Sequence, residues 1–152
     1  MSLSNLNTQI NTILLAVTGI GTKIYNYDVY ADNWSTFLSK FKNTGETKVS
    51  GWCFYRQKTE EETHTSRTNI RRHTFLFRGF YSLATDGSTL TSFQDLVELI
   101  ATAFRNKPSL NGVALITSAI QVDIIENRQF GEVLCHYAEL TLVVEEEEQW
   151  TE

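Results

Sequence analysis

Two apolar, strand-like segments flank a long polar stretch, and this arrangement limits what the chain can fold into. Residues 48–55 and 70–81 are rich in aromatic and β-branched side chains, which is typical of β-strands. Residues 56–69 between them contain no large apolar residue. A hairpin closes with about two to five loop residues, so this connection is longer than closure requires. We therefore expect a hairpin that carries a flexible polar arm over residues 56–69.

The apolar residues elsewhere follow helical and strand spacings around this hairpin. Apolar side chains at three- and four-residue intervals predict helices over 4–17 and 92–106. Aromatic and β-branched segments predict further strands over 23–30, 113–125 and 132–144. Strands joined in this way favour an antiparallel sheet. The expected fold is α+β, with two main helices packed on one face of that sheet.

Capping and turn residues predict where these elements begin and end. Ser4 is a candidate N-cap of the first helix, and Asp32 is one for a short helix that follows the first strand. Ser92 resembles the start of a capping box, and Pro108 cannot continue the helix before it. Polar residues 126–131 are expected to form the loop between the last two strands.

The composition fits a single domain over residues 1–152. An apolar content of 41% is sufficient for one core. The net charge is −5, and residues 145–148 are four consecutive glutamates. We therefore expect an acidic C-terminal tail at 145–152 on a nearly neutral body. A broad basic surface for nucleic acid is missing.

A nucleic-acid-binding sheet domain is nevertheless one alternative. Aromatic side chains on an antiparallel sheet can stack on bases. Residues 75–80 resemble such a motif superficially, but they lack its basic–glycine–aromatic order.

The two cysteines and the apolar segments indicate in which cellular compartment the protein is found. Cys53 and Cys135 lie in apolar strand-like segments, so we expect buried free thiols, with a single disulfide as the alternative. No lysine or arginine precedes the apolar residues 13–17, unlike a signal peptide, and no segment approaches the ~18 apolar residues of a membrane span. We expect a cytosolic protein with no membrane contact.

The residues that could carry chemistry do not converge. Cys135 and His136 are adjacent in a predicted strand, so their side chains point to opposite faces and cannot form a nucleophile–base pair. His64 and His73 match no zinc spacing, and consecutive glutamates on an extended segment would not meet at one ion. Gly19 and Gly21 lack the third glycine of a dinucleotide-binding fingerprint, and the Gly-Lys-Ser/Thr sequence of a phosphate loop does not occur. We expect no catalytic residue, cofactor or metal, and a small enzyme is kept only as an alternative.

The polar arm supplies the candidate contact residues. Its charges nearly cancel, so it is either a surface loop without a partner or a docking arm that becomes ordered against a neighbouring subunit. An aromatic residue beyond the acidic segment is either an anchor or simply exposed. The candidates for subunit or partner contact are Arg56, Lys58, Glu60, Glu61, Glu62, Arg67, Arg71 and Trp150.

Three segments resemble the tail terminator proteins of long-tailed bacteriophages, the lambda-type minor tail protein U family. They are Gly-Trp-Cys-Phe at 51–54, Phe-Gln-Asp-Leu-Val-Glu-Leu-Ile at 93–100, and Gly-Glu-Val-Leu-Cys-His-Tyr-Ala-Glu-Leu-Thr-Leu at 131–142. With the order of elements, the resemblance covers approximately residues 5–145.

The resemblance implies a structural virion protein. Such a protein forms a homohexameric ring on the head-proximal end of the tail tube, stops tube polymerisation and joins the head. Its partners would be tail tube protein and a head-completion or neck protein, and DNA would pass through without specific binding. The expected location is the neck of the virion, with assembly in the host cytoplasm. Another neck or tail-completion protein is the alternative within this class.

Overall fold

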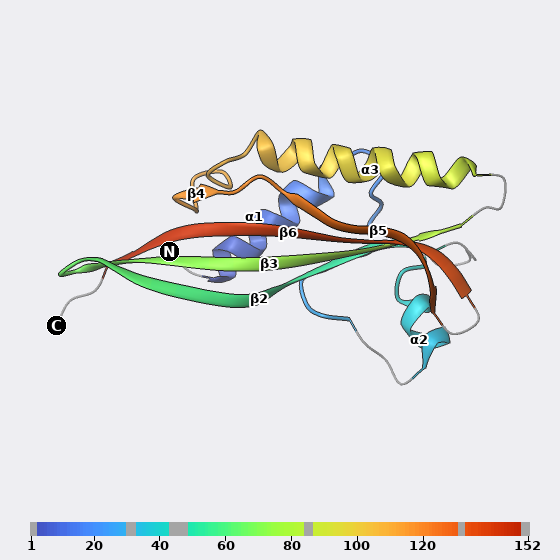
Figure 1. Ribbon diagram of the computed structural model, residues 1–152, viewed down its shortest axis with the longest axis horizontal. Helices are drawn as coiled ribbons and strands as arrows, with labels where there is room; N and C mark the ends of the chain where they lie inside the picture. Colours follow the sequence, from blue (N-terminus) through green and yellow to red (C-terminus); the bar gives the residue numbers. More distant parts are fainter. Residues whose placement is uncertain (1–2, 30–32, 43–48, 84–86, 131–132, 150–152) are drawn as a thin grey trace.

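The computed structural model describes residues 3–29, 33–42, 49–83, 87–130 and 133–149. A twisted sheet runs the length of the molecule and carries helices on both faces (Figure 1). The elements are α1 (Leu3–Leu15), β1 (Ile24–Tyr25), α2 (Trp34–Ser39), β2 (Ser50–Thr65), β3 (Thr68–Ser82), α3 (Ser88–Arg105), β4 (Ile116–Thr117), β5 (Gln121–Phe130) and β6 (Val133–Gln149). The fold is α+β, as the sequence predicts.

The sheet has the strand order β1-β2-β3-β6-β4, and β5 also pairs with β6. All pairs are antiparallel except β1 with β2, which are parallel. The three long strands β2, β3 and β6 therefore form the centre of the sheet, and the short strands lie along its margins.

The helices α1 and α3 cover one face of the sheet and build the main core. Phe104 of α3 packs edge-on against Phe77 of β3, with ring centroids 5.6 Å apart. Phe93 of α3 stacks on Trp52 of β2 at 6.1 Å. The apolar face of α1 joins the same core through Leu6, Ile10, Ile13 and Leu14. The prediction of two main helices on one face is confirmed.

A second, smaller core lies on the opposite face under α2. Phe37 and Phe41 of α2 and its C-terminal turn pack against Phe80 of β3, with ring centroids 5.2 and 4.7 Å away. The cap of α2 is Asn33, whose Oδ1 accepts a hydrogen bond from the Thr36 amide at 2.8 Å. The predicted cap, Asp32, lies outside the described residues.

Two predicted helix starts are wrong. Helix α1 already begins at Leu3, so Ser4 lies in its first turn and is not the N-cap. Helix α3 begins at Ser88 after Gly87, which takes a φ of 81° that glycine tolerates. Ser92 lies inside this helix, where its hydroxyl donates to the Ser88 carbonyl. The helix ends at Arg105, ahead of Pro108, as predicted.

The short strands also differ from expectation. The predicted strand 23–30 reduces to the two residues of β1, and the predicted strand 113–125 is divided between β4 and β5. The predicted loop at 126–131 is wrong as far as residue 130, because β5 continues to Phe130. This residue is buried against α2, which favours the longer strand.

Both cysteines, Cys53 and Cys135, are buried free thiols, so the expectation of buried thiols is confirmed and the disulfide alternative is wrong. Among the described residues, no helix has the length and apolarity needed to cross a bilayer.

Candidate functional site: a three-stranded arm

The polar stretch 56–69 is strand rather than loop. Strand β2 continues to Thr65, β3 starts at Thr68, and only residues 66 and 67 form the turn. Residues 145–149, expected in an acidic tail, continue β6 and pair with β3, so that Gln149 lies opposite Thr68. Three strands thus extend together beyond the helices and form an arm (Figure 1). We define the arm as residues 58–74 and 143–149.

Cross-strand ion pairs explain why this polar sequence forms strands. On one face, Arg71 of β3 lies between Glu61 of β2 and Glu146 of β6, with N–O distances of 3.6 and 3.0 Å. Opposite charges on neighbouring strands stabilise a sheet by roughly 0.2–1 kcal/mol per pair. Arg71 thereby connects all three strands.

The other face repeats this arrangement one residue further along. Arg72 contacts Glu62 at 2.8 Å and Glu145 at 2.7 Å. The hydrogen bond from Arg72 lowers the pKa of the Glu62 carboxyl, and that from Lys58 lowers the pKa of Glu60. The two arginines alternate between faces because successive side chains of a strand do so.

The base of the arm holds a buried polar cluster. His73 and Glu146 are fully buried, and His73 Nε2 lies 3.0 Å from Glu146 Oε1. The other ring nitrogen, Nδ1, is 2.8 Å from the Thr59 hydroxyl. The second carboxylate oxygen of Glu146 has no hydrogen-bond partner among the described residues. Buried polar groups are stable only when they are hydrogen-bonded, and these contacts join β2, β3 and β6, so the cluster depends on the register of all three strands.

The arm presents unpaired strand edges. Beyond Cys53, β2 pairs only with β3 in the described part of the chain. Exposed edges of this kind are surfaces on which another chain can add a strand. The charged side chains of the arm limit non-specific pairing there.

The predicted contact residues are partly brought together. Glu61, Glu62 and Arg71 belong to the ion-paired ladder, while Lys58 pairs with Glu60 at 2.7 Å. Arg56 only reaches Thr59 at the base, and Trp150 lies outside the described residues. Arg67 is in the turn, where its amide donates to the Thr65 hydroxyl at 3.3 Å.

Sequence reasoning missed the residues that complete the arm. Arg72, His73, Glu145 and Glu146 were not among the predicted contact residues, although all four pair across strands. The available signal was mirror symmetry: acidic pairs at 61–62 and basic pairs at 71–72 are equidistant from a turn at 66–67.

A second polar cluster holds the sheet together near α2. The Nε of Arg78 donates to the Tyr137 hydroxyl at 2.9 Å, and its Nη1 contacts Asp28 at 3.1 Å. Arg128 stacks over the Tyr137 ring at 4.2 Å from the centroid. Burial raises the pKa of Tyr137, and the Arg78 hydrogen bond opposes this shift. These groups satisfy one another, which is typical of a structural role.

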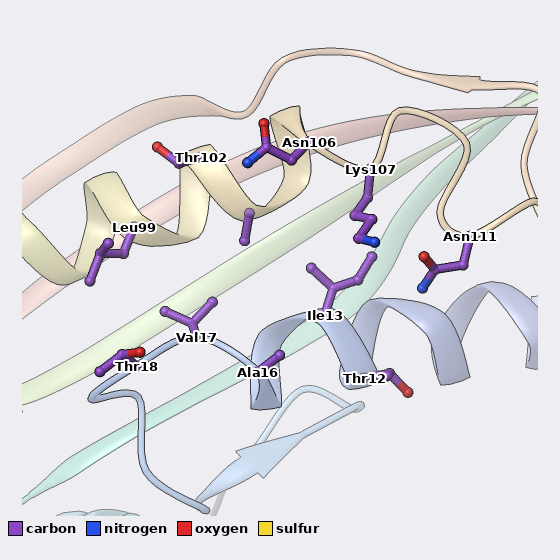
Figure 2. Close-up of a pocket in the computed structure, with 11 residues that line it drawn as sticks. Thr12, Ile13, Ala16, Val17, Thr18, Leu99, Thr102, Asn106, Lys107 and Asn111 are labelled. Atoms are coloured by element: carbon purple, nitrogen blue, oxygen red, sulfur yellow. The ribbon is translucent and has the colours of Figure 1, made fainter.

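The structure also has a hollow between α1 and α3 of about 490 Å³ (Figure 2). Its walls are mainly small or apolar. They include Ile13 of α1, Ala16 in the turn after α1, and Leu99 and Ala103 of α3. Lys107 is the one titratable residue of this lining. A general acid–base pair would need a second such group.

Metal-binding clusters of histidine, cysteine, aspartate and glutamate do not occur among the described residues. His136 is buried, and it contacts Thr89 Oγ1 at 2.8 Å and Asn127 Oδ1 at 2.9 Å. Cys135 belongs to the core under α2. Their separation onto two faces agrees with the strand alternation predicted for this pair.

Neither protein-family models nor curated protein sequences give a match to this chain.

Proposed function

We propose that this chain is a structural subunit of a bacteriophage virion: a tail terminator that forms a homohexameric ring on the head-proximal end of the tail tube. There it ends tube polymerisation and provides the surface for a head-completion protein. The proposal assigns the chain no catalytic step. Its sequence basis is the resemblance of residues 51–54, 93–100 and 131–142 to that family.

The observation that carries the proposal is the three-stranded arm. Residues 58–65, 68–74 and 143–149 extend past the two helices, where an isolated domain gains little core from them. The arm is held in one register by Arg71, Arg72 and their carboxylates. A preorganised projection costs less entropy on binding than a disordered loop, and this favours a docking role.

A ring suits this shape. Closed cyclic assemblies with more than two copies use heterologous contacts, in which one patch binds a different patch on the next copy. A projecting arm and a separate receiving surface fulfil that requirement. A polymer end-cap must also bind on one face only, which an asymmetric subunit permits.

The charge of the arm argues against a nucleic-acid-binding role. Arg71 and Arg72 are each engaged by two glutamates, so neither offers a free cation to phosphate. The surplus of acid is compatible with a channel that DNA passes through without binding.

Electron microscopy of the assembled particle tests this function. In cells that assemble the virus, loss of the gene should give overlong tubes and heads without tails, and restoring the gene should restore normal tails. Purified chain should form rings of several times the 17.4 kDa subunit mass, measured by light scattering. Tails of normal length in the absence of the gene would refute the proposal.

A further inference from the structure

We infer that the hollow between α1 and α3 receives Trp150 from the arm of a second copy of this chain. This inference names a contact within the assembly of the proposed function and rests on it. The hollow is the receiving surface and the end of the neighbour's arm is the occupant.

The hollow is shaped for a large apolar side chain. Small side chains form part of the lining: Thr12 of α1, Ala16 in the turn after α1, and Thr102 and Ala103 of α3. Ile13, Val17 and Leu99 supply apolar walls. An aromatic side chain gains most from such a site, because it brings a large apolar area and few rotatable bonds.

The charges around the two surfaces are complementary. The Lys107 side chain extends towards α1 at the hollow (Figure 2), and in the described part of the chain no carboxylate lies within ion-pair distance of it. Glu147 and Glu148, just before Trp150, likewise have no ion-pair partner among the described residues. The arm therefore brings unpaired acid to an unpaired lysine.

The geometry favours a second copy. Phe104 at the end of α3 packs on Phe77, which pairs with Leu140 of β6. At the other end of the hollow, Lys107 precedes Pro108, whose carbonyl accepts from the Thr117 amide, and Thr117 pairs with Val144. From Val144, β6 continues away for roughly 16 Å to Gln149, at about 3.3 Å per residue. The described end of the arm therefore points away from the hollow of its own chain while β6 stays paired with β3, so we assign the occupant to a second copy.

Disulfide trapping between two variants of the full chain tests the contact. One variant carries Trp150→Cys and the other carries Ala16→Cys in the hollow; the native cysteines are buried in both. The two are mixed under mild oxidation, and mixed dimers are measured by intact mass under non-reducing conditions. We expect at least tenfold more mixed dimer than with Gln94→Cys, an exposed residue of α3 outside the hollow. Equal yields, or no mixed dimer, would overturn the inference.

A charge exchange refines the test. Lys107→Glu in the Ala16→Cys chain should lower the yield of mixed dimer several-fold, and Glu148→Lys in the Trp150→Cys chain should restore it. Unchanged yields in both combinations would overturn the assigned orientation.

The exposed apolar residues beside β5 are the competing occupant from a second copy. Val122, Ile125 and Leu134 are 37–47% exposed. If Ile125→Cys, and not Trp150→Cys, is trapped by Ala16→Cys, the occupant is this edge and the inference is wrong.

The outcomes also distinguish failure of this contact from failure of the proposed function. If the chain forms rings but Trp150→Cys and Ala16→Cys give no cross-link, the contact is refuted and the proposed function is not. If the cross-link forms but tails are normal without the gene, the proposed function is refuted and the contact is not.

Discussion

His73 of β3 and Glu146 of β6 form a fully buried pair, with Nε2 of the imidazole 3.0 Å from Oε1 of the carboxylate. An ionised carboxylate can only accept hydrogen bonds, so in that state Nε2 carries a proton. Arg71 reaches the same oxygen at 3.0 Å from the solvent side. The pair lies where the arm leaves the core, so it links the register of the arm to the folding of the domain.

Removing the Glu146 carboxylate should destabilise the protein strongly. Glu146→Ala leaves the buried Nε2 of His73 without its partner, and a buried polar group left without a partner typically costs about 1–3 kcal/mol. Urea unfolding measures the free energy of unfolding. Glu147→Ala is the matched control, because Glu147 is exposed on the same strand and should change stability by less than about 0.5 kcal/mol. Equal effects of the two variants would contradict this role of the pair.

The close approach of Trp52 to Gly79 predicts a second sensitive position. A Cβ at Gly79 would lie 2.5 Å from Cη2 and Cζ2 of the buried Trp52 indole. Gly79→Ala should therefore cost about 2–3 kcal/mol, as overpacked cores do. In a Trp52→Leu background the same substitution should cost much less, because the clashing ring is gone. A double-mutant cycle by urea unfolding measures this coupling, and purely additive effects would show that the clash is relieved elsewhere.

The core of this fold can be predicted from the sequence, whereas the strands of the arm cannot. The strands at 48–55 and 70–81 were predicted because Trp52, Phe54, Phe75 and Phe77 follow the strand pattern of a buried sheet. Residues 56–69 lack apolar side chains and so carry no such signal. Their strands depend on Arg71 and on β6, which is distant in sequence. Strand preference depends on cross-strand neighbours, and a prediction from neighbouring residues in the sequence does not include them.

The helix starts and β5 show the same limit at smaller scale. Ser92 satisfies a local capping pattern, but the helix begins at Ser88 after the left-handed Gly87. Residues 126–130 are polar enough to predict a loop, yet Arg128 covers the Tyr137 ring and Phe130 fills the core under α2. Tertiary contacts override local preference in both places.

His136 should make stability depend on pH. Burial lowers the pKa of His136 below its ordinary value of 6.5, so the unfolded chain binds this proton more readily than the folded chain. The stabilisation is complete above pH 6.5 and is lost progressively as the pH falls below it. Urea unfolding between pH 7.5 and 5.5 should show this loss. His136→Gln should show a smaller loss over the same range; an identical dependence would assign the titration to other groups.

The Cys53 thiol should be unreactive in the folded protein. It is fully buried, and burial raises the pKa of Cys53 to about 11, so little thiolate is present at pH 8. Alkylation by iodoacetamide at pH 8, followed by mass spectrometry, should modify this residue only after unfolding in urea. A Thr65→Cys variant, exposed in the arm, should react within minutes and provides the control. Rapid modification of native Cys53 would indicate opening of the core under α2.

Shortening the arm should abolish assembly and leave the domain folded. Thr59 and His73 are directly paired, so residues 60–72 can be replaced by Asn-Gly, a two-residue hairpin turn. The chain is then ended at Val144, because residues 145–149 lose their partners on β3. The variant loses Glu146, so its free energy of unfolding should be lower than that of the full-length chain. The main core contains no residue of the removed segment, so circular dichroism and a cooperative urea transition should persist. Light scattering should show monomers where the full-length chain forms rings.

A variant that carries Asn-Gly only at residues 66–67 keeps the arm length and should still assemble. Rings from the shortened chain would show that assembly uses other surfaces, since neither the ion-paired ladder nor Trp150 remains in it.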